Sequence, residues 1–242
     1  MTETIYSTDA YAAEMDATIA DVDTAEWRVL LDRTVFYPGG GGQPPDTGAL
    51  WIGDDRLTVV KVASDSSGVW HWVSDDTGDA LPKIGQAVRG AVDWDRRYEL
   101  MRTHTAMHAL CGVVWERFHA PVTGGNMEPG EGRLDFEIPD WDTERDRQPI
   151  EDELNRQLAA ARPVEVSFLP REEADQDPSL IRTKVSLLPP SLRTVRVIDI
   201  VGLDRQADGG THVRDTTEVG AVTVAKVENK GKGFRRIRIR LA

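Results

Sequence analysis

The sequence predicts an α+β fold, with a small antiparallel β-barrel domain at residues 1–92 and a mixed α/β two-layer domain at residues 93–242. Three observations lead to this prediction. Short strand-like runs separated by turn residues fill the first part of the chain. A run with helical spacing of apolar residues begins near Asp95. Two alternating segments joined by a glycine-bearing turn close the chain.

The strands of the first domain are apolar or alternating runs bounded by turn-forming residues. They cover residues 27–31, 49–52, 57–62 and 68–73, with turns at 53–55 and 75–79, and residues 86–94 close the barrel. After the first strand come four consecutive glycines, Gly39–Gly42, which would cost much backbone entropy inside a strand or helix. They predict a loop, either a flexible hairpin tip or a backbone that approaches a ligand closely. No Gly-Lys-Ser/Thr follows, so this is not the phosphate loop of nucleotide-binding proteins.

The second domain begins with a helix at residues 95–118, in which Tyr98, Met101, His104 and His108 recur at spacings of three and four. A second helix is predicted at 149–161, because Ile150, Leu154, Leu158 and Ala161 form an apolar stripe at helical spacing. Pro149 is tolerated there, because in a first turn it loses no hydrogen bond. The remaining elements are a turn at 122–127, strands at 132–138, 163–169, 193–200, 220–228 and 234–241, and a charged, partly helical segment at 170–188.

The composition limits the class of protein and the compartment in which it is expected. The 242 residues carry a formal net charge of −12 and a single cysteine, Cys111, so no intrachain disulfide can form. No stretch of about 18 uncharged apolar residues exists, which predicts a cytoplasmic protein with no membrane span. Abundant acids and few lysines are typical of high-salt cytoplasm, although an ordinary acidic protein also fits. The acidity argues against a surface coated uniformly for nucleic-acid binding.

Two histidine-bearing motifs predict a metal site. His104 and His108 lie four apart on the predicted helix and therefore share one face. Far downstream, Asp208 and His212 are again four apart, in a glycine-bearing loop. Zinc prefers four nitrogen, oxygen or sulfur ligands in a tetrahedron. If the two motifs meet, they supply a complete site for one Zn²⁺ per chain.

The other histidines and the cysteine are weaker candidates. Cys111 lies about one turn beyond His108, but three ligands along one straight helix would span about 10 Å, too far for an ion with bonds of about 2 Å. Cys111 is therefore expected to be a small buried residue. His71 and His119 show no paired spacing and are expected to be structural or surface residues.

Four segments, in order, resemble the editing modules of alanyl-tRNA synthetases. They are residues 31–38 with the Gly-Gly-Gln continuation and 46–48, residues 101–108, residues 208–213, and the C-terminal turn with Arg235-Arg236-Ile237. Because no aminoacylation domain precedes them, the chain resembles the free-standing AlaX editing proteins in their longer form with an N-terminal barrel. That family usually has cysteine where Asp208 stands. A carboxylate is a harder ligand, so the choice of metal, and whether Asp208 or water completes the site, stay open.

The resemblance implies hydrolysis of the ester that joins serine or glycine to alanine tRNA, with the acceptor end of tRNA(Ala) as the partner. The metal would either activate water or position the substrate. The substrate-binding residues would be Thr34, Gly40, Gly41, Gly42, Gln43, Thr123, Gly124 and Asn126. Thr34 would contact the hydroxyl of serine, or is a plain strand-end residue. Residues 123–126 would line the site, or form an ordinary β-turn.

The remaining predictions concern the basic C-terminus and two alternative functions. RNA contact is expected at Lys230, Lys232, Arg235 and Arg236, although such residues can also protect a strand edge against aggregation. A metal-stabilised tRNA- or RNA-binding module without catalysis is the alternative function. A hydrolase of small esters is disfavoured, because the chain has no Gly-x-Ser-x-Gly motif. The sequence does not decide the oligomeric state.

Overall fold

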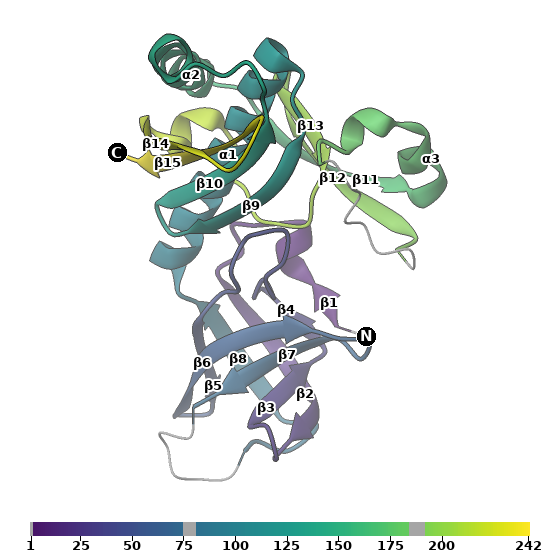
Figure 1. Ribbon diagram of the computed structural model, residues 1–242. Coiled ribbons are helices and arrows are strands. Elements are labelled where there is room, and N and C mark those ends of the chain that lie inside the picture. The colour runs from purple at the N-terminus through teal and green to yellow at the C-terminus, as the bar shows by residue number, and fades with distance from the viewer. Residues whose placement is uncertain (1, 75–80, 184–191) are drawn as a thin grey trace. The chain divides into compact units, whose positions relative to one another are not determined.

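The structure is a computed structural model that describes residues 2–74, 81–183 and 192–242 (Figure 1). The turn predicted at 75–79 and the end of the charged segment, residues 184–188, lie outside the described residues. The chain forms two compact units. The first comprises residues up to Gly40 and Pro44–Tyr98, and the second comprises Gly41–Gln43 and Glu99–Ala242. The domain boundary between residues 92 and 93 stays a prediction.

The first unit contains a closed antiparallel barrel in the order β2-β3-β7-β6-β5-β8 (Figure 1), so the predicted barrel is confirmed. Its strands are β2 (Glu14–Asp23), β3 (Arg28–Leu31), β5 (Gly48–Ile52), β6 (Asp55–Ser64), β7 (Val69–Val73) and β8 (Ala87–Val92). Two short strands, β1 (Glu3–Thr4) and β4 (Arg33–Thr34), pair in parallel, and η1 (Ile5–Ser7) is a 3-10 helix. The prediction missed β2, in which Met15, Ala17 and Ile19 alternate with polar residues and face the core.

A buried ion pair anchors the base of the glycine loop inside the first unit. Arg97 is fully buried and donates to both carboxylate oxygens of Asp46 and to the backbone carbonyls of Ala10 and Val35. Asp46 in turn accepts a hydrogen bond of 2.6 Å from the backbone N–H of Tyr37. Residues 37 and 46 flank the glycine loop, so this pair fixes the two ends of that loop.

Replacing Arg97 with glutamine is expected to lower the free energy of unfolding by about 3–5 kcal/mol, because it leaves the buried Asp46 carboxylate without its cation. Urea titration followed by circular dichroism measures the change. The control is Arg33→Gln, which removes an exposed partner of Glu3 and should cost no more than about 1 kcal/mol. Equal small losses in both variants would contradict the expected role of Arg97.

The second unit contains two antiparallel sheets with helices (Figure 1), which confirms the predicted mixed α/β region. The sheets have the orders β14-β15-β10-β9 and β11-β12-β13. Their strands are β9 (Val122–Glu128), β10 (Glu131–Glu137), β11 (Val164–Pro170), β12 (Thr194–Ile200), β13 (Asp204–Ala207), β14 (Val222–Asn229) and β15 (Phe234–Leu241). The helices are α1 (Trp94–Phe118), whose first residues up to Tyr98 belong to the first unit, α2 (Thr143–Leu158), α3 (Arg171–Gln176), η2 (Pro178–Leu180) and η3 (Thr216–Val219). No helix in the described residues is long and apolar enough to span a membrane.

Two predicted elements of the second unit are wrong. Residues 122–127 form strand β9 rather than a turn, because the glycines allow close packing. A Cβ at Gly125 would lie 3.0 Å from the Leu134 side chain of the neighbouring strand. Helix α2 begins six residues before the predicted start, since Asp142 caps it by accepting from the N–H groups of residues 144 and 145. Pro149 therefore lies inside the helix rather than in its first turn.

Candidate metal centre

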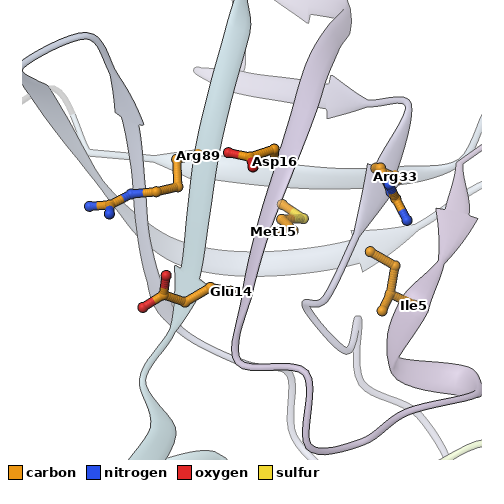
Figure 2. Close-up of a pocket in the computed structure, with 6 residues that line it drawn as sticks. All are labelled: Ile5, Glu14, Met15, Asp16, Arg33 and Arg89. Atoms are coloured by element: carbon orange, nitrogen blue, oxygen red, sulfur yellow. The ribbon is translucent and has the colours of Figure 1, made fainter.

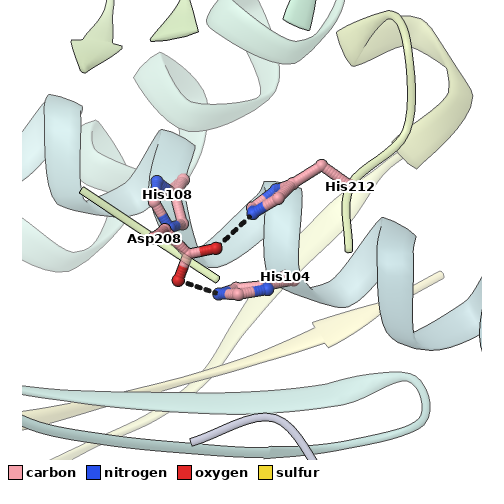
Figure 3. Close-up of side chains that lie close together, drawn as sticks. All are labelled: His104, His108, Asp208 and His212. Carbon is pink, nitrogen blue, oxygen red and sulfur yellow. Dashed lines mark hydrogen bonds and ion pairs between the residues drawn. The ribbon is translucent and has the colours of Figure 1, made fainter. Parts of the chain in front are cut away.

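His104, His108, Asp208 and His212 come together in the second unit. Each offers one ligand atom, and these atoms all lie within 4.8 Å of one another. The Nε2 atom of His212 lies 3.2 Å from Asp208 Oδ2, and that of His104 lies 3.7 Å from Asp208 Oδ1 (Figure 3). The two histidines of α1 thus meet the loop that follows β13, which is the condition on which the predicted metal site depended.

Three other side chains engage the Nδ1 atoms of the three imidazoles. Gln43 Oε1 lies 3.0 Å from His104 Nδ1, Asp204 Oδ2 lies 3.0 Å from His108 Nδ1, and Thr105 Oγ1 lies 3.1 Å from His212 Nδ1. Metal-ligating histidines usually hold their second ring nitrogen in such a bond, which fixes the tautomer and the ring orientation. In this arrangement all three Nε2 atoms remain for a common ion.

The four residues fit a divalent metal. Three imidazole nitrogens and one carboxylate form a donor set that zinc accepts. Four ligands at about 2.1 Å from an ion in a tetrahedron would lie about 3.4 Å apart, close to the separations around Asp208. All three histidines are buried, and Asp208 is largely so. The group therefore has the chemistry, the spacing and the shielding from water that a metal site needs.

Burial keeps two of the rings in the neutral form that binds metals. It holds the pKa of His104 well below the ordinary value and lowers the pKa of His212 to about 4. At His108, burial lowers the pKa, but the hydrogen bond and charge of Asp204 more than offset it, so the pKa of His108 is raised. A metal that binds His108 must therefore compete with a proton on that ring.

The loop that carries Asp208 is held in place by its own backbone and by Arg196. The N–H of Gly210 donates to Asp208 Oδ2 at 2.7 Å. The Arg196 guanidinium donates to the carbonyls of Asp208 and Gly210 at 3.0 and 2.8 Å. A Cβ at Gly210 would collide with the His104 ring and lie 2.6 Å from Gln43 Oε1, so only glycine lets the loop approach the helix this closely.

The glycine loop reaches the metal group through Gly41–Gln43, the three residues that belong to the second unit. A Cβ at Gly41 would lie 3.7 Å from Asp208 Oδ1. Gly42 accepts a hydrogen bond from Met127 N, and both glycines have positive φ angles. Gln43 makes two hydrogen bonds with Thr211: its Nε2 donates to Thr211 Oγ1, and its Oε1 accepts from the N–H of Thr211. This segment is therefore a wall of the metal group rather than a free hairpin tip.

Asp204 is a buried carboxylate behind His108. It is 2% exposed, and its Oδ2 also accepts from Gln206 Nε2 at 2.6 Å. Among the described residues, its Oδ1 has no hydrogen-bond partner and lies 3.8 Å from Arg182 Nε, which also has none there. Arg182 stacks on the Trp115 ring at 4.3 Å.

The structure places the remaining predicted residues as follows. The hydroxyl of Thr34 lies in the first unit, 2.8 Å from His71 Nε2, and accepts from the N–H of Phe36. Gly40 also belongs to the first unit, where its carbonyl accepts from Tyr37. On β9, Gly124 pairs with Asp135 and Asn126 with Arg133, and a Cβ at Gly42 would lie 3.4 Å from Asn126 Cα. Thr123 is exposed.

Residues outside the site also behave largely as expected. Cys111 is buried and is not part of the metal group, and burial raises the pKa of its thiol well above the ordinary value. His71 is buried with Thr34, while His119 is exposed and bonds to the backbone carbonyl of Trp115.

Most of the basic tail is neutralised by neighbouring carboxylates. Arg236 pairs with Asp135, Arg238 with Glu228, and Arg240 with Glu131. Lys230 and Lys232 lie exposed in the turn between β14 and β15. Arg235 hydrogen-bonds to the backbone of Phe234.

The prediction missed Asp204, Thr105 and Arg196, which hold the ligands and their loop. Thr105 follows a ligand directly in sequence, so its place beside the site had a weak signal. Asp204 and Arg196 had none. Asp204 meets His108 only through tertiary packing, and Arg196 meets the Asp208 loop because β12 pairs with β13.

Comparisons with known proteins agree over the whole chain. Residues 5–96 match the family model of class II (A) tRNA synthetases, and residues 195–238 match the second additional domain of threonyl and alanyl tRNA synthetases. The chain is 36% identical to the alanyl-tRNA editing protein AlaX-M of Saccharolobus solfataricus over 98% of both chains, and equally identical to AlaX-M of Methanosarcina barkeri over 98% of both. It is 35% identical to the alanine–tRNA ligase of Thermococcus kodakarensis, covering 98% of this chain and 25% of the ligase.

Proposed function

Because this chain belongs to the AlaX-M family of alanyl-tRNA editing proteins, we propose that it hydrolyses the ester bond of alanine tRNA mischarged with serine, and also with glycine. The observation that carries the proposal is the meeting of two remote motifs around one metal-sized space. An aminoacyl ester is already activated, so positioning and a polarised water suffice, and no ATP is needed.

We propose Zn²⁺ as the ion, held by His104, His108, Asp208 and His212. When bound there, zinc supplies a Lewis acid that polarises an oxygen of water or substrate. The protein's own groups do the rest. The Nδ1 partners fix each imidazole, Gly210 and Arg196 hold the Asp208 loop, and Gly41–Gln43 shields the site.

Thr34 is the proposed contact for the hydroxyl of serine. A threonine hydroxyl has one donor and two acceptor positions. If Thr34 donates to His71 Nε2 and accepts from the N–H of Phe36, one acceptor position remains for a substrate hydroxyl. Alanine and glycine cannot use this position, so it favours serine. Gly40–Gln43, Thr123, Gly124 and Asn126 are proposed to shape the pocket.

The partner is proposed to be the acceptor end of tRNA(Ala). In the basic tail, Lys230 and Lys232 are the exposed cations best placed for phosphate contact. Arg235 and Arg236 would join them, although Arg236 must exchange its Asp135 partner for a phosphate.

The test measures release of labelled serine, glycine and alanine from alanine tRNA, with zinc present and ATP absent. We expect serine to be released at least about a hundredfold faster than alanine, because the pocket hydrogen-bonds the serine hydroxyl. Glycine should also be released faster than alanine. Tight tRNA binding without release of any amino acid would overturn the proposal and favour a metal-stabilised RNA-binding module.

A further inference from the structure

Two rows of stacked cations and tryptophans run around the outer surface of the barrel and meet at β6. In the first row, Arg56 on β6, Trp51 on β5 and Arg89 on β8 lie directly opposite one another. The guanidinium carbons of Arg56 and Arg89 lie 5.9 and 4.7 Å from the centroid of the Trp51 ring. The neighbouring Leu50 and Val88 face the core, so the row points outward.

The second row lies on the adjoining strands. Arg28 on β3, Trp72 on β7 and Lys61 on β6 are again directly opposite one another. Arg28 and Lys61 lie 5.0 and 4.3 Å from the centroid of the Trp72 ring. Strand β6 joins the two rows, and Val60, beside Lys61, is 55% exposed.

The outer cations of these rows lack the carboxylate partners that neutralise the basic tail. Among the described residues, no carboxylate oxygen lies within 4.0 Å of a charged nitrogen of Arg56, Lys61 or Arg89. Asp16 lies opposite Arg89 in register, but the Arg89 guanidinium extends away from it (Figure 2). Arg28 differs, because it pairs with Asp23 at 2.9 Å.

We propose that this barrel face, defined by Trp51, Arg56, Lys61, Trp72 and Arg89, contacts the phosphate backbone of the tRNA. The identity of the RNA rests on the proposed function. A chain with a net charge of −12 repels a polyanion, so it needs local cations without carboxylate partners to hold one. Stacking on the indole rings holds these cations in place, so less side-chain freedom is lost when a phosphate binds.

The dimensions and the apolar parts of the face also suit an RNA strand. Arg56 and Lys61 are five residues apart on β6, and a β-bulge between Val59 and Lys61 lets both side chains face outward. At 3.3 Å per residue they lie at most about 16 Å apart, which spans several consecutive phosphates. The partly exposed indoles and Val60 offer apolar surface to ribose and bases.

The test is binding of uncharged alanine tRNA at several KCl concentrations, which does not depend on hydrolysis. The triple variant Arg56→Gln, Lys61→Gln, Arg89→Gln should reduce the slope of log affinity against log salt by about 2–3, since each phosphate contact contributes about 0.7–0.9. At 0.1 M KCl this corresponds to a loss of affinity of about a hundredfold. The control, Arg156→Gln, removes a cation on α2 that is paired with Glu153 and should leave the slope unchanged.

Further measurements distinguish failure of this proposal from failure of the proposed function. If the triple variant does not fold, Arg56→Gln and Arg89→Gln alone should each reduce the slope by about 0.7–0.9. With seryl-tRNA, the variants should raise KM and leave kcat unchanged. A wild-type salt slope in folded variants would overturn the proposal and leave these rows as stabilising cross-strand pairs or a site for an acidic protein. If the wild-type protein binds tRNA, and the variants reduce its salt slope as expected, but no serine is released, the proposed function is overturned and the RNA contact stands.

Discussion

Replacement of His104 by alanine is expected to remove the bound metal and to slow release of serine from alanine tRNA by more than about a hundredfold. Loss of a residue that only hydrogen-bonds to a metal ligand lowers metal affinity or activity about 10–100-fold. The effect should be larger here, because His104 is itself a ligand of the proposed site. Metal analysis of the purified variant and single-turnover deacylation measure the two effects.

The control for this prediction is His119→Asn. His119 is exposed just beyond the end of α1 and has a positive φ angle, which asparagine tolerates better than alanine. This variant should keep both its metal and its activity. Wild-type activity in His104→Ala would show that the chemistry does not need this ligand.

Replacement of Asp204 by asparagine is expected to weaken metal binding by about 10–100-fold. Asparagine keeps the shape and can still accept from His108 Nδ1, but it removes the buried negative charge beside the ligand. Competition with a chelator measures the affinity. At saturating zinc the variant should recover most of its activity, because the four ligands are unchanged.

Asp199→Asn is the matched control for Asp204. Asp199 lies on the neighbouring strand β12, and its partner is Arg205 rather than a metal ligand. Its loss should leave metal affinity at the wild-type value. An Asp204→Asn variant that binds zinc as tightly as this control would contradict the role assigned to Asp204.

The sequence predicted those parts of the fold that local patterns specify. Strands β3, β5, β6, β7 and β8 were predicted from apolar runs between turn residues, and α1 was predicted from apolar residues at helical spacing, whereas the alternating strand β2 was missed. Strand β9 was missed because Gly124 and Gly125 signal a turn locally, whereas packing against Leu134 makes them strand residues. The start of α2 was missed because Pro149 suggested a first turn, although Asp142 caps the helix earlier.

The candidate site likewise contains residues that a local pattern predicts and residues that only tertiary packing brings together. The spacing of four identified the two pairs of candidate metal ligands, but only tertiary packing brings the two pairs together. The prediction that Gln43 binds substrate stays a proposal, while the contacts of its amide with His104 and Thr211 depend on where the glycine loop packs and were not predicted. Asp204 joins His108 across 96 residues, and no local pattern reports such a contact.

The most direct test of the account is X-ray absorption spectroscopy of the metal in the purified protein. We expect about one zinc ion per chain, with nitrogen and oxygen ligands at about 2.0–2.1 Å and no sulfur at about 2.3 Å, since Cys111 lies outside the site. A sulfur shell, or a protein that deacylates seryl-tRNA while holding no metal, would contradict it.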